Sequence, residues 1–247
     1  MALVFTDLCF RYGRKTDVFT GLDLRIDSPA TVLLGPNGAG KSTLMALAAS
    51  QLVPVRGQVS WREVSPTARR DQAAYRKAVA WIPQQITPLP GLTVREQVAY
   101  AGWLKGMSRT AAWDASAEAL ERVRLTELSS RKSHQISGGQ QRRMGIAGAL
   151  THSSELILMD EPTAGLDPQQ RAVFRSLVEE LSNNMQVVVS THQTEDLADL
   201  YSHVVVLDRG TVRFQGTTGA FDALAEGVDS PRGRAEAAYA RLVGQEA

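Results

Sequence analysis

The sequence predicts an α/β fold in which a mainly parallel sheet is flanked by helices and carries an inserted helical lobe. Apolar, strand-sized segments alternate with helical segments in the second half of the chain, which is typical of a parallel sheet covered by helices. The stretch from about 91 to 150 has helical periodicity instead. With 247 residues, of which 43% are hydrophobic, the chain suits one domain with such a lobe.

The first third of the chain contains short segments that are rich in β-branched and aromatic residues. Such segments, bounded by Gly, Asp, Ser and Pro, are predicted to be strands. They cover residues 3–10, 22–26, 31–34, 57–61 and 78–82. The third of them leads directly into a glycine-rich loop and then into a helix-forming segment.

Three helices are predicted for the lobe. Thr93 and Glu96 have the spacing of a capping box, which predicts a helix from there to about residue 105. A second helix is expected from 108 to about 123, and a third from near Ser137. The apolar residues at helical spacing in the second helix are Trp113, Ala117, Leu120 and Val123.

The second half of the chain returns to alternating strands and helices. Strands are expected at 155–159 and 186–190, and a hairpin of 204–207 and 212–214 around Asp208-Arg209-Gly210. An amphipathic helix is expected over 171–181. Its inward residues are predicted to be Val173, Phe174, Leu177, Val178 and Leu181. The main domain is expected to end at about 217, and 218–247 to form a short helical tail with a turn at 227–233.

The loop after the third strand has the pattern G-x-x-x-x-G-K-[ST] in a strand–loop–helix setting. Glycines let the backbone wrap around a phosphate, and the following helix directs its N-terminal N–H groups at the anion. Lys41 would supply charge to the β- and γ-phosphates, and Ser42 a hydroxyl to Mg²⁺. The pattern therefore predicts a P-loop NTPase core rather than an ordinary glycine-rich turn. The predicted nucleotide-binding residues here are Gly35, Pro36, Asn37, Gly38, Ala39, Gly40, Lys41, Ser42 and Thr43.

Two acidic residues end the apolar strand Leu156–Met159. Ligands bind at the carboxyl ends of strands in open α/β sheets, so Asp160 and Glu161 are expected where they can act on a bound ligand. Asp160 would hold Mg²⁺, directly or through a water, and Glu161 would polarise the water that attacks the γ-phosphate. In isolation, two acids after a strand could simply begin a loop; the phosphate loop favours the catalytic interpretation.

Several further motifs make the chain resemble the ATP-binding-cassette (ABC) ATPases over almost its whole length. Ile136-Ser137-Gly138-Gly139-Gln140 is similar to the family's signature sequence, with Ile136 where leucine is usual. By the same resemblance Tyr12 would stack on adenine. Gln84 would join the metal and the attacking water to the helical lobe, although the sequence alone leaves Gln85 as an alternative. Asp167 would lie in the loop that crosses between subunits, and His192 would be the switch histidine at the γ-phosphate.

The resemblance implies a RecA-like core with an antiparallel β-subdomain and an inserted α-helical subdomain. It also implies ATP and Mg²⁺ as ligands, with Gln84 joining Ser42 and Asp160 at the metal. Because the chain has one phosphate loop and one signature, it is expected to pair head-to-tail with itself or a paralogue. Ser137, Gly138, Gly139 and Gln140 would then close over the partner's ATP.

The expected task is ATP hydrolysis for separately encoded transmembrane permease subunits, with closest resemblance to the branch of drug, antibiotic and lipid exporters. The alternative is an ATPase of a soluble complex, such as one for iron–sulfur cluster assembly. Charge argues against nucleic acid, since the net charge is +1 and the pI about 7.9. One cysteine and no long apolar run indicate a cytoplasmic protein, peripheral on the inner face of the membrane through a partner. The remaining histidines, His134, His152 and His203, are expected on the surface without forming a metal set.

Overall fold

The main sheet is six-stranded with the order β5-β6-β7-β3-β8-β9 in the computed structural model, which describes residues 1–13, 16–194, 200–225, 227–228 and 230–243. All pairings from β5 to β8 are parallel, and only β9 runs antiparallel, as the second strand of the predicted hairpin. The mainly parallel sheet is thereby confirmed. Its strands are β3 (Ala30–Leu34), β5 (Val79–Ile82), β6 (Leu156–Asp160), β7 (Gln186–Thr191), β8 (His203–Asp208) and β9 (Thr211–Thr217).

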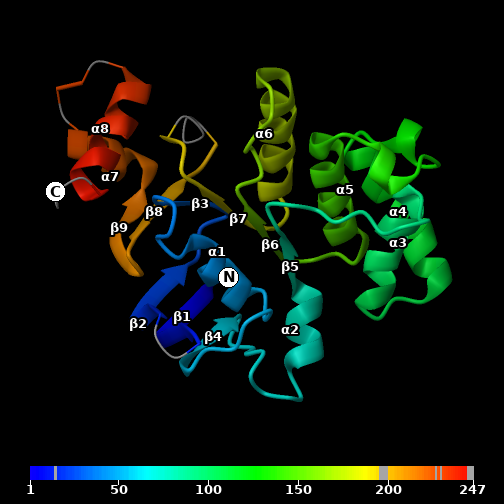
Figure 1. Cartoon of the computed structure of the whole chain (residues 1–247), viewed down its shortest axis with the longest axis horizontal. Helices are drawn as coiled ribbons and strands as arrows, with labels where there is room; N and C mark the ends of the chain where they lie inside the picture. Colours follow the sequence, from blue (N-terminus) through cyan, green and yellow to red (C-terminus); the bar gives the residue numbers. More distant parts are fainter. Residues whose placement is uncertain (14–15, 195–199, 226, 229, 244–247) are drawn as a thin grey trace.

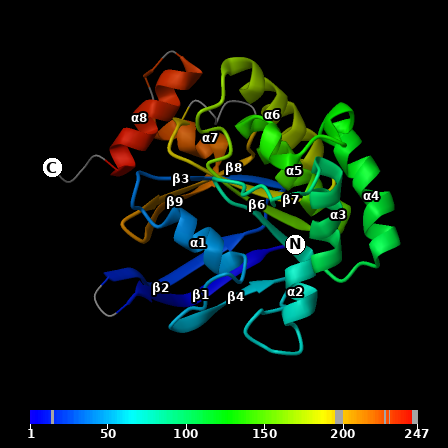
Figure 2. The same cartoon turned by 45° about the vertical axis from the view of Figure 1, so that its right-hand side comes forward.

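A second, three-stranded antiparallel sheet has the order β2-β1-β4 and confirms the predicted β-subdomain. Its strands are β1 (Leu3–Tyr12), β2 (Thr16–Ile26) and β4 (Arg56–Trp61). Figure 2 shows α1 (Lys41–Ala48) lying between this sheet and the main one. The phosphate loop, which directly precedes α1, therefore lies where the two sheets meet.

The main sheet has a separate hydrophobic core on each face because successive residues of a strand point to opposite sides. In β3, Leu33 packs with α1 and the antiparallel sheet, whereas Val32 and Leu34 pack toward the other helices. Residues of β6 alternate in the same way. Strands buried on both faces explain the uninterrupted apolar runs of the sequence.

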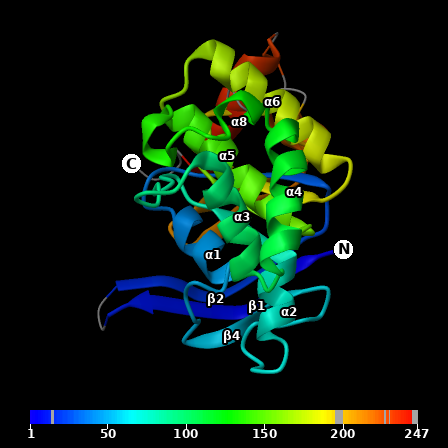
Figure 3. The same cartoon turned by 90° about the vertical axis from the view of Figure 1, so that its right-hand side faces the viewer.

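The helical lobe consists of α3 (Val94–Leu104), α4 (Arg109–Arg122) and α5 (Gly138–Thr151), with short 3₁₀ turns at Thr126–Leu128 (η1) and Ser133–Gln135 (η2). Figure 1 shows these helices together at one end of the molecule, and Figure 3 views the molecule from that end. The predicted capping box is confirmed: the Thr93 side chain accepts from the N–H of Glu96, whose carboxylate accepts from the N–H of Thr93.

Two of the four apolar residues at helical spacing in α4 do not face the core. Trp113 is 43% exposed and Ala117 is exposed, while Ala112, Ser116 and Ala119 are buried. Small residues form the contact because α4 packs closely on α3 and α5. The indole of Trp113 instead lies outside, where the guanidinium of Arg95 stacks over it at 4.0 Å.

The remaining helices cover the main sheet or its edge. They are α2 (Gln72–Ala78), α6 (Pro168–Ser182), α7 (Thr218–Asp222) and α8 (Pro231–Val243), with a 3₁₀ turn (η4) at Ala223–Ala225. In α6 the predicted inward residues are buried except Val173, which is partly exposed because it borders a cavity beside α5. Phe221 and Ala238 of the C-terminal segment join the main core. Within the described residues, no helix is both long and apolar enough to cross a membrane.

Candidate functional site

The phosphate loop connects β3 to α1 with backbone geometry that requires glycine. A Cβ at Gly35 would lie 2.2 Å from the carbonyl oxygen of Leu207, and Gly40 has φ +103°, with Phe19 packed against it. Gly40 is the N-cap of α1 and makes no side-chain capping bond, so the first N–H groups of the helix have no cap. A helix N-terminus open in this way suits an anion.

Lys41 lies at the base of this loop, with its side chain only 5% exposed. Its ammonium donates to the carbonyl oxygens of Gly35 at 2.7 Å and Pro36 at 3.1 Å. Burial lowers the pKa of Lys41, and the carboxylates of Glu161 and Asp160 partly offset this. The cation is therefore held in a partly dry site by groups that a phosphate can replace.

The two acids at the end of β6, Asp160 within the strand and Glu161 directly after it, have different surroundings. Asp160 is buried, and the Ser190 hydroxyl donates to its Oδ1 at 2.5 Å. The same hydroxyl accepts from the backbone N–H of Glu161 at 3.0 Å. Glu161 has φ +43°, uncommon for a non-glycine residue, which turns its side chain away from the strand. No role was predicted for Ser190 from the sequence; the available signal is a hydroxyl directly after the apolar run 187–189 of β7.

Glu161 is held between two nitrogen-bearing side chains. Its Oε1 lies 3.6 Å from Nζ of Lys41, and its Oε2 lies 2.9 Å from Nδ1 of His192. His192 follows the end of β7, the strand next to β6. The carboxylate thus has a cation on the phosphate-loop side and an imidazole on the other.

One cavity of about 510 Å³ brings these groups together with two other predicted residues. Gln84 lines it and Gln85 does not, because β5 ends at Ile82 and the chain turns there. Tyr12 also lines it with its side chain half exposed, and its hydroxyl lies 3.2 Å from that of Thr43. The cavity is lined by Tyr12, Val18, Pro36–Thr43, Gln84, Glu161, Ala164 and His192.

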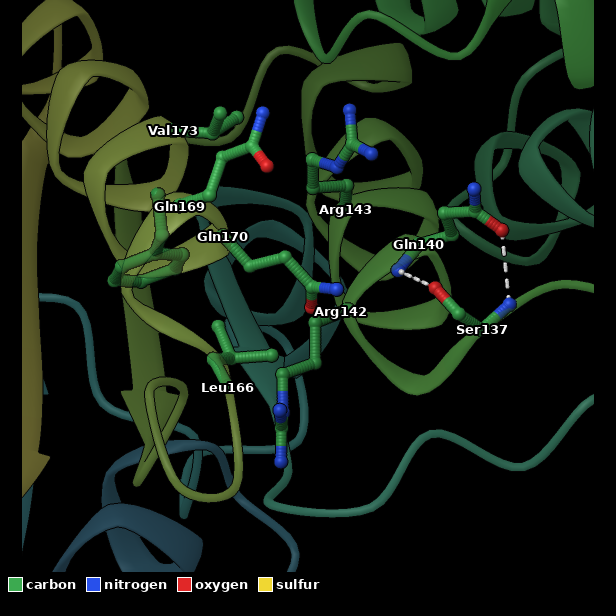
Figure 4. Close-up of a pocket in the computed structure, with 10 residues that line it drawn as sticks. Ser137, Gln140, Arg142, Arg143, Leu166, Gln169, Gln170 and Val173 are labelled. Carbon is green, nitrogen blue, oxygen red and sulfur yellow. Dashed lines mark hydrogen bonds between the residues drawn. The ribbon is translucent and has the colours of Figure 1, made fainter.

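The predicted signature residues lie elsewhere. Ser137 is the N-cap of α5 and forms a second capping box with Gln140: its hydroxyl accepts from the N–H of Gln140 at 3.3 Å, and Gln140 Oε1 accepts from the N–H of Ser137 at 2.8 Å. These residues border a smaller cavity of about 190 Å³ between α5 and α6, which Figure 4 shows. Asp167 caps α6 by accepting from the N–H of Gln170 at 2.8 Å. Neither group lines the phosphate-loop cavity.

The residues of the large cavity fit a magnesium–nucleotide. The glycine-dependent loop and the uncapped N-terminus of α1 suit a polyphosphate, and Tyr12 offers an aromatic face. Of the predicted metal ligands, Ser42 and Gln84 line the cavity, whereas Asp160 is buried beside it at the end of β6. All three supply oxygen atoms, which Mg²⁺ prefers. Bound Mg²⁺ would neutralise phosphate charge beside Lys41.

The expectation that His152 lies on the surface was wrong. It is 4% exposed, in a groove between β5 and helices α3 and α5. Burial, then the neighbouring charge of Lys105, lowers the pKa of His152 to about 4. Its position directly after α5 gave no sign of this, because the groove is formed by distant segments. Across the described residues, no cluster of His, Cys, Asp and Glu could by itself hold a metal ion.

The profile of the ABC transporter family matches residues 21–164, which include the phosphate loop, the signature and both acids at the end of β6. The chain belongs to the ABC transporter family. As an ABC cassette it is an ATP-binding ATPase domain, and the resemblance found in its motifs is confirmed.

Characterised ABC relatives are about one third identical to the chain. The linearmycin resistance ATP-binding protein LnrL of Bacillus subtilis is 35% identical over 83% of this chain and 66% of its own length. The arginine transport ATP-binding protein ArtP of Escherichia coli K12 is 35% identical over 86% of this chain and 90% of its own. The energy-coupling factor transporter ATP-binding protein EcfA2 of Latilactobacillus sakei is 34% identical over 88% of this chain and 79% of its own.

Solved ABC structures share the fold. An ATP-binding subunit of an ABC transporter superposes with a TM-score of 0.83 over 98% of this chain and 99% of its own, at 24% identity. The dimeric bacterial ABC cassette MJ0796 gives a TM-score of 0.77 over 87% of this chain and 98% of its own, at 25% identity. The P-loop core with its antiparallel and helical subdomains is therefore the ABC cassette fold.

Proposed function

We propose that the chain is the ATPase of a membrane transporter, in which two cassettes close head-to-tail around two ATP–Mg and drive permease subunits. The observation that carries this proposal is the single cavity that joins the phosphate loop to Glu161, Gln84 and His192. Lys41 and the N-terminus of α1 would bind the phosphates. Glu161 would accept the proton of the attacking water while His192 orients the Glu161 carboxylate.

The placement of the signature supports the dimer. Ser137 begins a helix whose N-terminus can bind phosphate, yet it borders a different cavity from Lys41. A nucleotide in the large cavity therefore leaves the signature of the same chain unused. A second copy, or a paralogue, turned head-to-tail would bring its signature onto that nucleotide, and the similar cassette MJ0796 is a dimer.

The groove that contains His152 is the proposed seat of the permease. It lies between β5 and the helical lobe, and none of the described residues that line it is acidic. Nε1 of Trp81 and Nδ1 of His152 are buried there without a hydrogen-bond partner in the described part of the chain. Buried polar groups ordinarily have partners, so two without one beside a groove free of acidic side chains support this position for the permease.

Export of a drug-like, antibiotic or lipid-like molecule is the proposed direction of transport. LnrL, a relative named for linearmycin resistance, supports it. ArtP, named for arginine transport, and EcfA2, an energy-coupling factor protein, have other tasks at nearly the same identity. Identification of the membrane partner would therefore decide the direction of transport and the class of molecule transported.

Affinity capture from gently solubilised native membranes tests the proposal. Tagged full-length Glu161→Gln protein is used with Mg-ATP, and Lys41→Ala protein serves as the matched control. The proposal expects a polytopic membrane protein at comparable yield, with less captured by Lys41→Ala. Soluble partners alone, with no cassette in the membrane fraction, would contradict it and favour an ATPase of a soluble assembly complex.

A further inference from the structure

Arg142 connects the signature helix to the loop that follows the catalytic strand. It lies on α5, five residues after Ser137, and its Nη2 donates to the carbonyl oxygen of Ala164 at 2.7 Å. Figure 4 shows its side chain extending beside Leu166, away from the direction taken by Arg143. The helical lobe thus reaches the Ala164–Asp167 loop through a charged donor, a stronger contact than a neutral hydrogen bond.

The other end of this contact belongs to the hydrolytic site. Ala164 lines the phosphate-loop cavity, and its backbone N–H donates to the carbonyl oxygen of Glu161 at 3.2 Å. A hydrogen-bonded path therefore runs from α5 through Arg142 and Ala164 to the backbone of Glu161. A displacement of α5 would move the residue that faces the attacking water.

The guanidinium of Arg142 also retains an unused donor. Its Nε is buried, and no described residue accepts a hydrogen bond from it. Burial lowers the pKa of Arg142. A buried donor without an acceptor is costly, and this cost falls if the helix shifts so that a second carbonyl comes within reach. The present contact therefore leaves part of the hydrogen-bonding capacity of this side chain unused.

We propose that Arg142 is a positioning residue that couples the two ATP sites of the dimer. When the partner's ATP binds the signature at the start of α5, Arg142 transmits the helix displacement to the Ala164–Asp167 loop and sets Glu161 of its own site. This inference rests on the proposed head-to-tail dimer. It adds that ATP bound at one site controls turnover at the other through this guanidinium.

Arg143 provides a matched control on the same helix. Its Nη1 donates to the carbonyl oxygens of Val123 at 2.9 Å and Arg124 at 3.1 Å, both within the helical lobe. Its pKa is also lowered, first by burial and then by the charge of Arg124. Replacing it removes a similar buried cation and similar bonds to carbonyls without touching the Ala164–Asp167 loop.

The test compares ATPase kinetics of the full chain with Arg142→Ala, Arg142→Lys and Arg143→Ala. Arg142→Ala should lower kcat about tenfold or more and reduce the Hill coefficient for ATP from about 2 toward 1. The dissociation constant of ATP at the phosphate-loop cavity, which contains Lys41, should stay within about twofold of the wild-type value. Arg142→Lys should restore part of both values, because an ammonium can still donate to Ala164. Arg143→Ala should keep the wild-type Hill coefficient.

Two results would overturn the inference, and they are distinguishable. If wild-type protein is cooperative and Glu161→Gln protein dimerises with ATP, but Arg142→Ala keeps the wild-type kcat and Hill coefficient, Arg142 does not couple the sites. If wild-type protein shows no cooperativity and Glu161→Gln protein stays monomeric with ATP, the dimer itself fails and the coupling with it. Thermal unfolding of each variant separates these effects from loss of fold.

Discussion

Lys41 and Glu161 form an ion pair across the nucleotide cavity, with Nζ 3.6 Å from Oε1 and the two side chains only 5% and 12% exposed. Lys41 comes from the phosphate loop after β3, and Glu161 follows β6, which is separated from β3 by β7 in the sheet. A γ-phosphate entering between them would take over the cation and leave the carboxylate facing water. The ion pair therefore places the proposed phosphate-binding ammonium of Lys41 directly beside the proposed water-activating carboxylate of Glu161.

Lys41→Ala is expected to weaken ATP binding by at least about 100-fold, since hydrogen bonds to charged groups contribute roughly 1.5–3 kcal/mol each. Isothermal titration calorimetry with ATP measures it. Lys77→Ala, which removes an exposed lysine, should bind like wild type. An unchanged affinity in Lys41→Ala would be incompatible with the assigned role of the loop.

Tyr12→Ala should lower ATP affinity about five- to thirty-fold, because base–aromatic stacking contributes about 1–2 kcal/mol. Tyr12→Phe keeps the ring and loses only the contact between the hydroxyls of Tyr12 and Thr43. It should bind ATP nearly as wild type does. Equal losses in both variants would assign the effect to the hydroxyl and not to stacking.

His152 should make the protein sensitive to mild acid. Its pKa is about 4 when folded against an ordinary 6.5, so the unfolded chain binds the proton more readily between these values. Stability is then highest above pH 6.5 and falls as the pH drops toward 4. Between pH 7 and pH 5 the loss attributable to this residue is of the order of 2 kcal/mol.

Urea unfolding of His152→Gln at the two pH values measures this contribution. The variant should lose less free energy of unfolding on acidification than wild type does. His134→Gln, at an exposed histidine, should keep the wild-type dependence. A pH dependence identical in wild type and His152→Gln would show that other groups are responsible.

Local signals explain what the sequence could predict. The phosphate loop, the capping box at Thr93, the helix start near Ser137 and the hairpin at Asp208 each depend on a few adjacent residues, and all four form where expected. The same is true of the alternation that predicts the parallel sheet. These patterns describe backbone requirements that hold wherever the segment lies.

Features set by distant segments could not be predicted. The short helix α2 has no side-chain cap and only Tyr75 buried, so its sequence carries little periodicity. Trp113 has helical spacing with the buried Leu120 and yet is exposed, because α4 packs through its small residues. The choice of Gln84 over Gln85 at the cavity, and the link from Arg142 to Ala164, likewise depend on how separate elements meet.

Two properties of the Glu161→Gln protein decide whether two cassettes enclose ATP and whether Glu161 activates the attacking water: its oligomeric state and its ATPase rate. Light scattering during size-exclusion chromatography of the Glu161→Gln protein measures the first, and a steady-state ATPase assay the second. We expect a dimer with Mg-ATP, a monomer with ADP, and turnover lowered by at least about 100-fold with ATP affinity retained. A Glu161→Gln protein that stays monomeric with ATP and hydrolyses it at the wild-type rate would exclude both roles.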